Sequence, residues 1–157
     1  MIGIEPDRGA AVSQFLPHEG DAVLLDAVWI DSPLATCGTA TVRAGTPFHD
    51  EPSGWPAWVA IELMAQVIAA GAGLRDATPG RRPRLGLLLG ARGFESREAL
   101  YPLGNQLEIR VVESTRGIDG MAVYDCRIDT AGQQLAQAVL SVCLPEDIDE
   151  YLDSLEP

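Results

Sequence analysis

The chain has 157 residues, of which 46% are hydrophobic and 22% charged, a balance that indicates one folded domain rather than a disordered chain. Its formal net charge of −12 argues against nonspecific nucleic-acid binding, because no excess of basic residues exists to release counterions from a phosphate backbone.

The most apolar stretch, residues 55–74, is interrupted by Glu62 and Gln66. A carboxylate at the centre of a membrane span is costly, so this stretch is expected to be a buried helix and no membrane span is expected. Residues 1–7 combine neither a basic start nor a long apolar run, so no secretory signal is expected either.

The three cysteines, Cys37, Cys126 and Cys143, are odd in number, widely spaced and set in apolar, strand-like segments. This pattern is typical of small core residues in a reducing compartment rather than of disulfides or metal ligands. We therefore expect a cytoplasmic protein.

The chain begins with an expected loose leader, residues 1–12, and a short turn within residues 13–19. Two β-type runs follow, residues 22–30 and 35–43, separated by the turn signal Asp31-Ser32-Pro33. A loop rich in glycine and proline then leads to Pro56, the type of residue that commonly occupies the first position of a helix.

Residues 56–75 are predicted to form one long helix. The segment is apolar nearly all round, which indicates that the rest of the protein encloses it. Gly71 and Gly73 either weaken its last turns or allow another element to pack closely.

Four further β-type segments are predicted, at about 85–95, 106–115, 120–130 and 133–144. They are separated by the hairpin-like turns Pro102–Asn105, Gly117–Gly120 and Ala131-Gly132. Residues 146–157 carry six acidic residues, with apolar residues at helical spacing, and are expected to be a short acidic helix docked by one face, or a frayed tail.

Two strands, one buried helix and four more strands predict an α+β domain over residues 13–145. A curved antiparallel sheet wrapped around the central helix, the hotdog architecture, fits this order of elements. A sandwich with one crossing helix fits the same pattern.

Glu62 is a candidate catalytic acid. Its neighbours are apolar, so desolvation is expected to raise its pKa towards neutrality. Trp58, Glu62 and Gln66 share one face of the predicted helix. The alternative is a buried Glu62–Gln66 pair, joined by a hydrogen bond, that only shapes the core.

His49 is a candidate general base, since it lies in the loop before the helix, 13 residues upstream of Glu62, and an imidazole titrates near neutral pH. The alternative is a histidine on a surface loop. The other histidine, His18, is expected to orient backbone.

The backbone N–H groups of Ala57 and Trp58 have no partner within the predicted helix and lie at its positive end. A thioester carbonyl placed there would have its developing oxyanion stabilised. A base, an acid and oxyanion donors are the set that β-elimination requires, and all three lie between Phe48 and Glu62. No phosphate-binding loop, metal-spaced cluster or nucleophile elbow is apparent, so no cofactor or metal is expected.

Five of the chain's arginines fall in one short segment and are candidates to bind an acidic partner, although a solvated face is the alternative. They are Arg81, Arg82, Arg84, Arg92 and Arg97.

Three segments resemble the 3-hydroxyacyl-acyl-carrier-protein dehydratases of bacterial fatty-acid synthesis. Leu16-Pro17-His18 with the following Leu24–Val28 is similar to their opening, and Pro56–Gln66 is similar to the helix that carries their acidic residue. Phe94 with Tyr101–Leu107 is similar to a later strand and turn. The sequences of Pro56–Gln66 and Leu85–Arg92 resemble the accessory dehydratases of aryl-polyene pigment clusters more closely still.

The resemblance implies a hotdog dimer with active sites at the subunit interface, where a histidine of one chain faces the acidic residue of the other. It implies cofactor-free dehydration of a 3-hydroxyacyl group, carried on the phosphopantetheine arm of an acidic acyl carrier protein, to the trans-2-enoyl form. Carried over by position, Glu62 is the acid and Ala57 and Trp58 supply the helix-start amides.

The family's histidine lies one position earlier than His49, where this chain has Phe48. That shift motivates a second hypothesis, a catalytically weak hotdog subunit that pairs with an active dehydratase. The pair formed by this chain is then a homodimer or a heterodimer. A hotdog thioesterase is a third hypothesis, because such enzymes tend to carry their carboxylate on the same helix.

Overall fold

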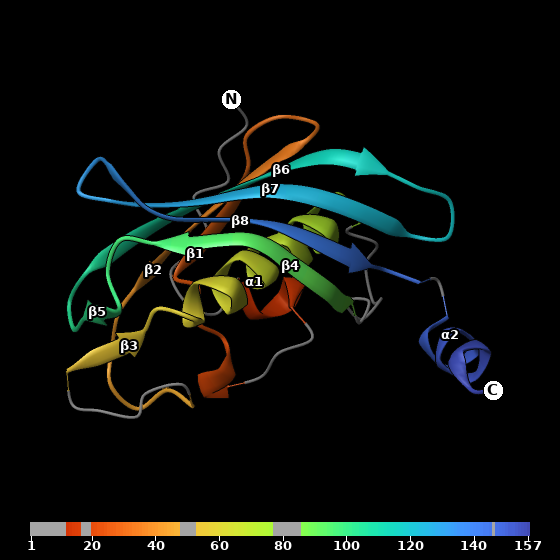
Figure 1. The fold of residues 1–157 in the computed structure, drawn as a ribbon, viewed down its shortest axis with the longest axis horizontal. Coiled ribbons are helices and arrows are strands. Elements are labelled where there is room, and N and C mark those ends of the chain that lie inside the picture. Colours follow the sequence, from red (N-terminus) through yellow and green to blue (C-terminus); the bar gives the residue numbers. More distant parts are fainter. Residues whose placement is uncertain (1–11, 17–19, 48–52, 77–85, 146) are drawn as a thin grey trace.

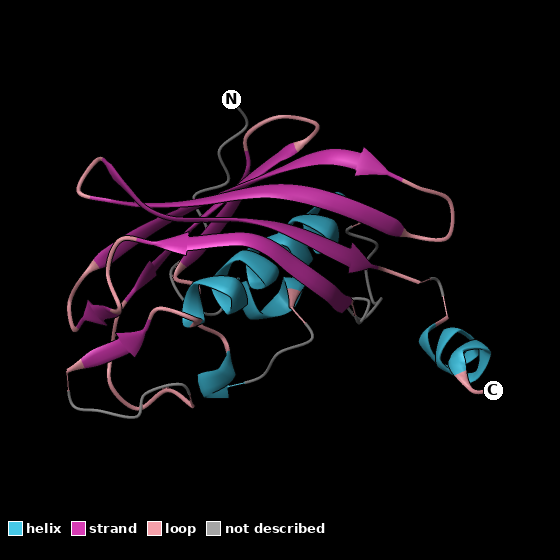
Figure 2. Ribbon diagram, in the orientation of Figure 1, coloured by secondary structure: helices cyan, strands magenta, loops and turns pink. Residues whose placement is uncertain are grey.

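The computed structural model describes residues 12–16, 20–47, 53–76, 86–145 and 147–157. Within them, one antiparallel sheet curves around the long helix α1 (Figure 1), and a second, short helix stands at the C-terminal end (Figure 2). The elements in chain order are the 3-10 helices η1 (Val12–Phe15) and η2 (Gly20–Ala22), the strands β1 (Ala27–Ile30), β2 (Ala35–Thr41) and β3 (Gly54–Pro56), the helix α1 (Val59–Arg75), the strands β4 (Leu87–Ser96), β5 (Leu100–Pro102), β6 (Gln106–Arg116), β7 (Met121–Thr130) and β8 (Gln133–Cys143), and the helix α2 (Ile148–Leu155).

Six strands form the main sheet in the order β1-β2-β6-β7-β8-β4, and each neighbouring pair is antiparallel. β3 and β5 form a separate two-stranded ribbon that leads into the start of α1. A single sheet wrapped around one helix confirms the hotdog architecture and excludes, for the described residues, the sandwich alternative.

The burial pattern of the strands explains why the sheet closes on α1. Along β6, the side chains of Leu107, Ile109 and Val111 are buried, whereas Glu108 and Arg110 between them are exposed. Successive side chains of a strand point to opposite faces, so each long strand presents one apolar face to the helix. The side chains of α1 are buried on several sides of the helix, as its apolar composition predicts.

Small residues let α1 approach its neighbours closely. A Cβ atom added to Gly71 would lie 2.4 Å from Oγ1 of Thr36, and one added to Gly73 would lie 2.7 Å from the backbone oxygen of Phe15. Gly71 and Gly73 therefore serve close packing, the second of the two readings of these glycines.

The structure corrects two element boundaries. Pro56 ends β3 and α1 begins at Val59, because residues 54–56 pair with β5 before the chain turns into the helix. The first predicted strand, 22–30, is shortened to β1, since the backbone of Ala22 and Leu24 bonds to the side chain of Gln66 instead of to a neighbouring strand.

The termini differ in how they pack. Val12, assigned above to the leader, is fully buried in the core, while residues 1–11 lie outside the described part of the chain. The short acidic helix expected at the C-terminus is present as α2, and its first amides, those of Asp149 and Glu150, donate to the Asp147 carboxylate. Leu152 and Leu155 of α2 are exposed, so these two apolar side chains do not dock on the rest of the described chain as expected.

The cysteines behave largely as expected, since Cys126 and Cys143 are buried and Cys37 is half-buried, all three as free thiols. In the described part of the chain, α1 is not long and apolar enough to cross a membrane, and neither is any other helix.

Candidate active site

Gln66 is the anchor of the candidate site, because its side chain is fully buried and makes three hydrogen bonds. Its Nε2 donates to the backbone oxygen of Ala22 at 2.7 Å and to Oε1 of Glu62 at 3.0 Å. Its Oε1 accepts from the backbone N–H of Leu24 at 2.9 Å. Donation to one backbone group and acceptance from the other leave the amide a single orientation, so the group that faces Glu62 is the N–H.

Glu62 lies half-buried in the first turn of α1, one turn before Gln66. The hydrogen bond between the two confirms that they share a helix face. The hydrogen-bonded Glu62–Gln66 pair that the sequence offered as an alternative is therefore present. It places one carboxylate oxygen at a defined position near the helix start.

The start of α1 holds the two candidate oxyanion amides. The N–H of Ala57 donates to the backbone oxygen of Ala99 at 3.0 Å, so this amide is engaged by the β4–β5 connection. Trp58 occupies the N-cap position, and its side chain is 51% exposed, an unusual exposure for a tryptophan. The engagement of the Ala57 amide is a contact that the sequence did not predict.

Tyr101 of β5 packs beside this helix start and is fully buried. Its hydroxyl lies 2.9 Å from Oγ of Ser96 and donates to the backbone oxygen of Ala57 at 3.4 Å. Burial raises the pKa of the Tyr101 phenol, with the Ser96 hydrogen bond opposing that shift. Tyr101 is thus a neutral hydrogen-bonding group that helps to fix the helix start.

Arg43 and Trp55 complete the polar surroundings, and the sequence did not single out either of them. The guanidinium of Arg43 donates to the backbone oxygens of Val23 and Leu24, at 2.7 and 3.2 Å. The indole N–H of the fully buried Trp55 is shared between the backbone oxygen of Arg43, at 3.1 Å, and Oγ1 of Thr46, at 3.0 Å. Two features of the sequence could have pointed to them as site residues: Arg43 ends an alternating strand, and Trp55 lies between Gly54 and Pro56.

Several predicted site residues lie outside the described part of the chain. His49 and His18 are among them, and so are Arg81, Arg82 and Arg84. Arg92 lies exposed on β4, and Arg97, which follows β4, is also exposed and donates to Oε1 of Gln133 at 3.3 Å. The structure therefore brings Glu62, Gln66 and the helix start together.

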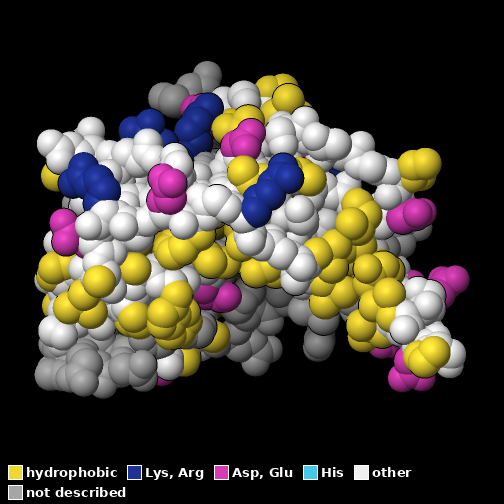
Figure 3. Space-filling model, in the orientation of Figure 1, with side chains coloured by type: hydrophobic (Ala, Val, Ile, Leu, Met, Phe, Trp, Pro, Cys, Tyr) yellow, Lys and Arg dark blue, Asp and Glu magenta, His cyan; other side chains and the backbone are white. Residues whose placement is uncertain are grey.

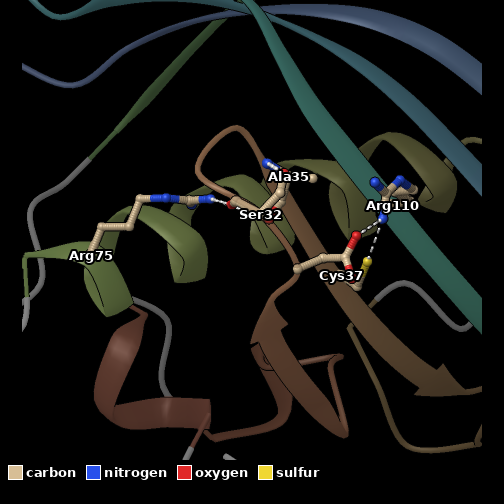
Figure 4. A network of polar contacts seen from close by, with 6 residues as sticks. Ser32, Ala35, Cys37, Arg75 and Arg110 are labelled. Carbon is tan, nitrogen blue, oxygen red and sulfur yellow. Dashed lines mark hydrogen bonds and ion pairs between the residues drawn. The ribbon is translucent and has the colours of Figure 1, made fainter. Parts of the chain in front are cut away.

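A second polar network lies at the opposite, C-terminal end of α1 (Figure 4). Arg75 donates to Oγ1 of Thr36 at 2.7 Å and to the backbone oxygens of Ser32 and Ala35 at 3.1 and 3.2 Å. Nearby, Arg110 pairs with Asp31 and contacts the Cys37 thiol, whose pKa burial raises. The Arg75 contacts tie the β1–β2 turn to the end of α1, away from Glu62, and the Arg110 contacts tie the same region to β6.

No group of three or more histidine, cysteine and acidic side chains suited to hold a metal ion occurs among the residues that the structure describes.

The chain is similar to known dehydratases and, in fold, to thioesterases. The model of the ApeP-like family, described as ApeP dehydratase, matches residues 10–153. A chain of the dehydratase heterocomplex ApeI:P from Xenorhabdus doucetiae superposes with a TM-score of 0.82 at 27% identity, covering 93% of this chain and 97% of that one. No curated protein matches the sequence.

More distant structures share the fold alone. A mutant of the phenylacetic acid degradation protein PaaI from Thermus thermophilus has a TM-score of 0.57 at 20% identity, covering 78% of this chain and 95% of that one. A hypothetical thioesterase from Streptococcus pneumoniae, solved with coenzyme A, has a TM-score of 0.56 at 15% identity, covering 79% and 91%. With the family model spanning nearly the whole domain, the chain belongs to the ApeP-like dehydratase family.

Proposed function

We propose that this chain dehydrates 3-hydroxyacyl thioesters carried on an acyl carrier protein to trans-2-enoyl thioesters, in the cytoplasm and within aryl-polyene or fatty-acid biosynthesis. Membership of a dehydratase family supports the reaction type. The observation that carries the proposal is the half-buried carboxylate of Glu62, held by the buried Gln66 in the first turn of α1. An acid fixed at a helix start is what the departure of a hydroxyl group requires.

In the proposed reaction, His49 accepts the proton from C2 of the acyl chain. The amide of Trp58 stabilises the negative charge that develops on the thioester oxygen, and the amide of Ala57 joins it only if its bond to Ala99 is released. Glu62 gives its proton to the C3 hydroxyl, which leaves as water while the C2–C3 double bond forms. Proton exchange with solvent then returns the imidazole and the carboxylate to their starting states.

We further propose that the chain works as a pair with a related dehydratase subunit. The similar chain from Xenorhabdus doucetiae occurs in a dehydratase heterocomplex, which supports this proposal. β4 forms one edge of the sheet, and Leu88 and Leu89 on it are 46% and 44% exposed. Hydrophobic side chains gather along this edge and continue towards α2 (Figure 3). An exposed apolar edge strand is a template for pairing with another strand, so β4 is the proposed contact with the second subunit.

The acidic carrier protein is proposed to bind the arginine-rich segment, of which Arg92 and Arg97 are exposed on and just beyond β4. Arg92 lies on the proposed contact strand and Arg97 just beyond it, so the proposed carrier site adjoins the dimer interface. Replacement of both by serine is expected to raise KM for the carrier-bound substrate, with less effect on a short thioester that lacks the carrier.

The test is turnover of a 3-hydroxyacyl group on its carrier protein, followed by mass spectrometry as the loss of water. The chain is assayed alone and mixed with a related dehydratase subunit from the same source. Turnover that disappears in the Glu62→Gln and His49→Ala variants supports the proposal. Release of a free carrier thiol without water loss would instead identify a thioesterase.

The heterocomplex also favours a second candidate, a subunit that supports catalysis by its partner. The same two variants, mixed with the wild-type partner, distinguish the candidates. If both mixtures retain the full rate while the partner alone is slow, the chain is a supporting subunit. If either mixture loses turnover, this chain supplies catalytic groups.

A further inference from the structure

A continuous chain of hydrogen bonds connects Glu62 with the segment that leads into the loop before α1. From Glu62 it passes to Gln66, and from Gln66 to the backbone of Ala22 and Leu24. Arg43 binds the same short segment from its other side, through the oxygens of Val23 and Leu24. Residues 22–24 are therefore held between α1 and Arg43, which follows the end of β2.

The chain continues from the backbone of Arg43 through the indole of Trp55. Trp55 N–H bonds to the oxygen of Arg43 and to the hydroxyl of Thr46, which is itself buried. Thr46 precedes the candidate base His49 by three residues in the sequence. One scaffold thus anchors the carboxylate of Glu62 and also fixes the chain just before the His49 loop.

We propose that Arg43 and Trp55 are positioning residues of the dehydratase site, which hold the anchor of Glu62 and the segment at Thr46 in a fixed relation. This inference rests on the function proposed above. Neither side chain is assigned contact with substrate. Their effect is exerted through residues 22–24 and Thr46, and displacement of a catalytic group by about 1 Å can lower a rate by up to about 100-fold.

A role in folding alone explains the connection of Arg43 and Trp55 to Glu62 less well. A residue that serves folding alone needs no connection to the candidate acid, and Arg75 provides such a case. Arg75 also binds two backbone oxygens and a threonine hydroxyl, yet at the other end of α1 (Figure 4). Both arginines donate to two backbone oxygens, but of the two it is Arg43 that binds the segment bonded to Gln66, so Arg75 serves as the control.

The variants are Arg43→Met and Trp55→Phe, with Arg75→Met as the control. Methionine and phenylalanine retain apolar volume while removing the hydrogen-bond donors. Each variant is assayed in the form in which the wild type is active, either alone or mixed with the partner subunit. The Tm of each variant is recorded as well. We expect Arg43→Met and Trp55→Phe to lower kcat about tenfold with KM changed by less than about twofold.

Arg75→Met is expected to lower Tm about as much as Arg43→Met does, while its kcat stays within about twofold of wild type. Wild-type kcat in Arg43→Met and Trp55→Phe overturns the inference, and so does an equal loss of kcat in Arg75→Met. A variant too unstable to assay is replaced by Arg43→Lys, which keeps the charge and loses the two-pronged geometry, and is expected to give an intermediate kcat.

A measurement independent of activity separates this inference from the proposed function. The Leu24 amide donates to Gln66, so its hydrogen exchange reports on the anchor of Glu62. Exchange is expected to accelerate in Arg43→Met and to remain unchanged in Arg75→Met; unchanged exchange in Arg43→Met overturns the inference. If the wild type fails to dehydrate while this exchange pattern holds, the proposed function is wrong and the connection between Arg43 and the Gln66 anchor stands.

Discussion

The side-chain nitrogen of Gln66 lies 3.0 Å from Oε1 of Glu62, and the same nitrogen donates to the backbone oxygen of Ala22. A buried amide with both N–H groups engaged has little freedom to move. The carboxylate that it contacts is therefore held in place before any substrate arrives, which is the arrangement expected of a catalytic acid.

Replacement of Glu62 by glutamine tests that role without disturbing the fold. The glutamine oxygen can still accept from Gln66, so the free energy of unfolding should change by less than about 1 kcal/mol. The rate of dehydration should fall by at least about 100-fold, because an amide cannot protonate the leaving hydroxyl. Steady-state kinetics with urea denaturation measures both, and Glu108→Gln, on the exposed face of β6, is the control. A retained rate would remove Glu62 from the mechanism.

Replacement of Gln66 by leucine should destabilise the fold itself. Leucine has a similar volume, but it leaves the backbone N–H of Leu24 and the oxygen of Ala22 without their present partner. Buried polar groups without partners cost about 1–3 kcal/mol each, so loss of both partners should lower the free energy of unfolding by about 2–6 kcal/mol. Gln137→Leu, at an exposed position on β8, should change it by less than about 0.5 kcal/mol. Equal effects of the two variants would show that the buried network does not contribute.

Gly38 is a second position at which β2 lies close to α1, besides the contact of Thr36 with Gly71. A Cβ atom there would lie 2.9 Å from Cγ2 of Val67 and 3.1 Å from the backbone oxygen of Ala27. Gly38→Ala should therefore destabilise the chain by about 1–3 kcal/mol through overpacking. At Gly90 the added methyl group meets no atom within 4 Å, so Gly90→Ala should leave stability unchanged or slightly raised. Thermal denaturation measures both effects, and equal Tm values for the two variants would contradict the close packing at Gly38.

The alkaline limit of stability should depend on buried thiol and phenol groups, since the sequence contains no lysine. Burial raises the pKa of the Cys126 thiol from 9.0 to about 12, and burial also raises the pKa of Tyr124. A raised folded-state pKa means that the folded state binds more protons than the unfolded state above about pH 9. The contribution of Cys126 is thus complete below about pH 9 and declines as pH rises towards 12.

Urea denaturation at a series of pH values measures this decline. Each such group contributes a slope of up to about 1.4 kcal/mol per pH unit between its two pKa values. Cys126→Ala should reduce the slope above about pH 9 while its stability at neutral pH falls by the cost of a small cavity. An unchanged slope would mean that the Cys126 thiol ionises alike in both states.

Periodicity alone predicts most of the architecture. The alternation of β6 to β8 and the predominantly apolar character of α1 specify an antiparallel sheet that covers a buried helix, and the structure confirms both. The i, i+4 spacing of Glu62 and Gln66 similarly predicts their contact, because neighbouring turns of a helix place such side chains together.

Tertiary structure alone decides which backbone groups those side chains meet. Gln66 reaches residues 22–24, more than 40 positions earlier in the chain, and that contact replaces the strand expected there. The amide of Ala57 is engaged by Ala99, and Trp55 bonds to Arg43 and Thr46, through pairings that no local pattern encodes. Local periodicity determines helices and strands, whereas buried polar groups take whatever partners the packed chain brings within reach, and those partners build the site.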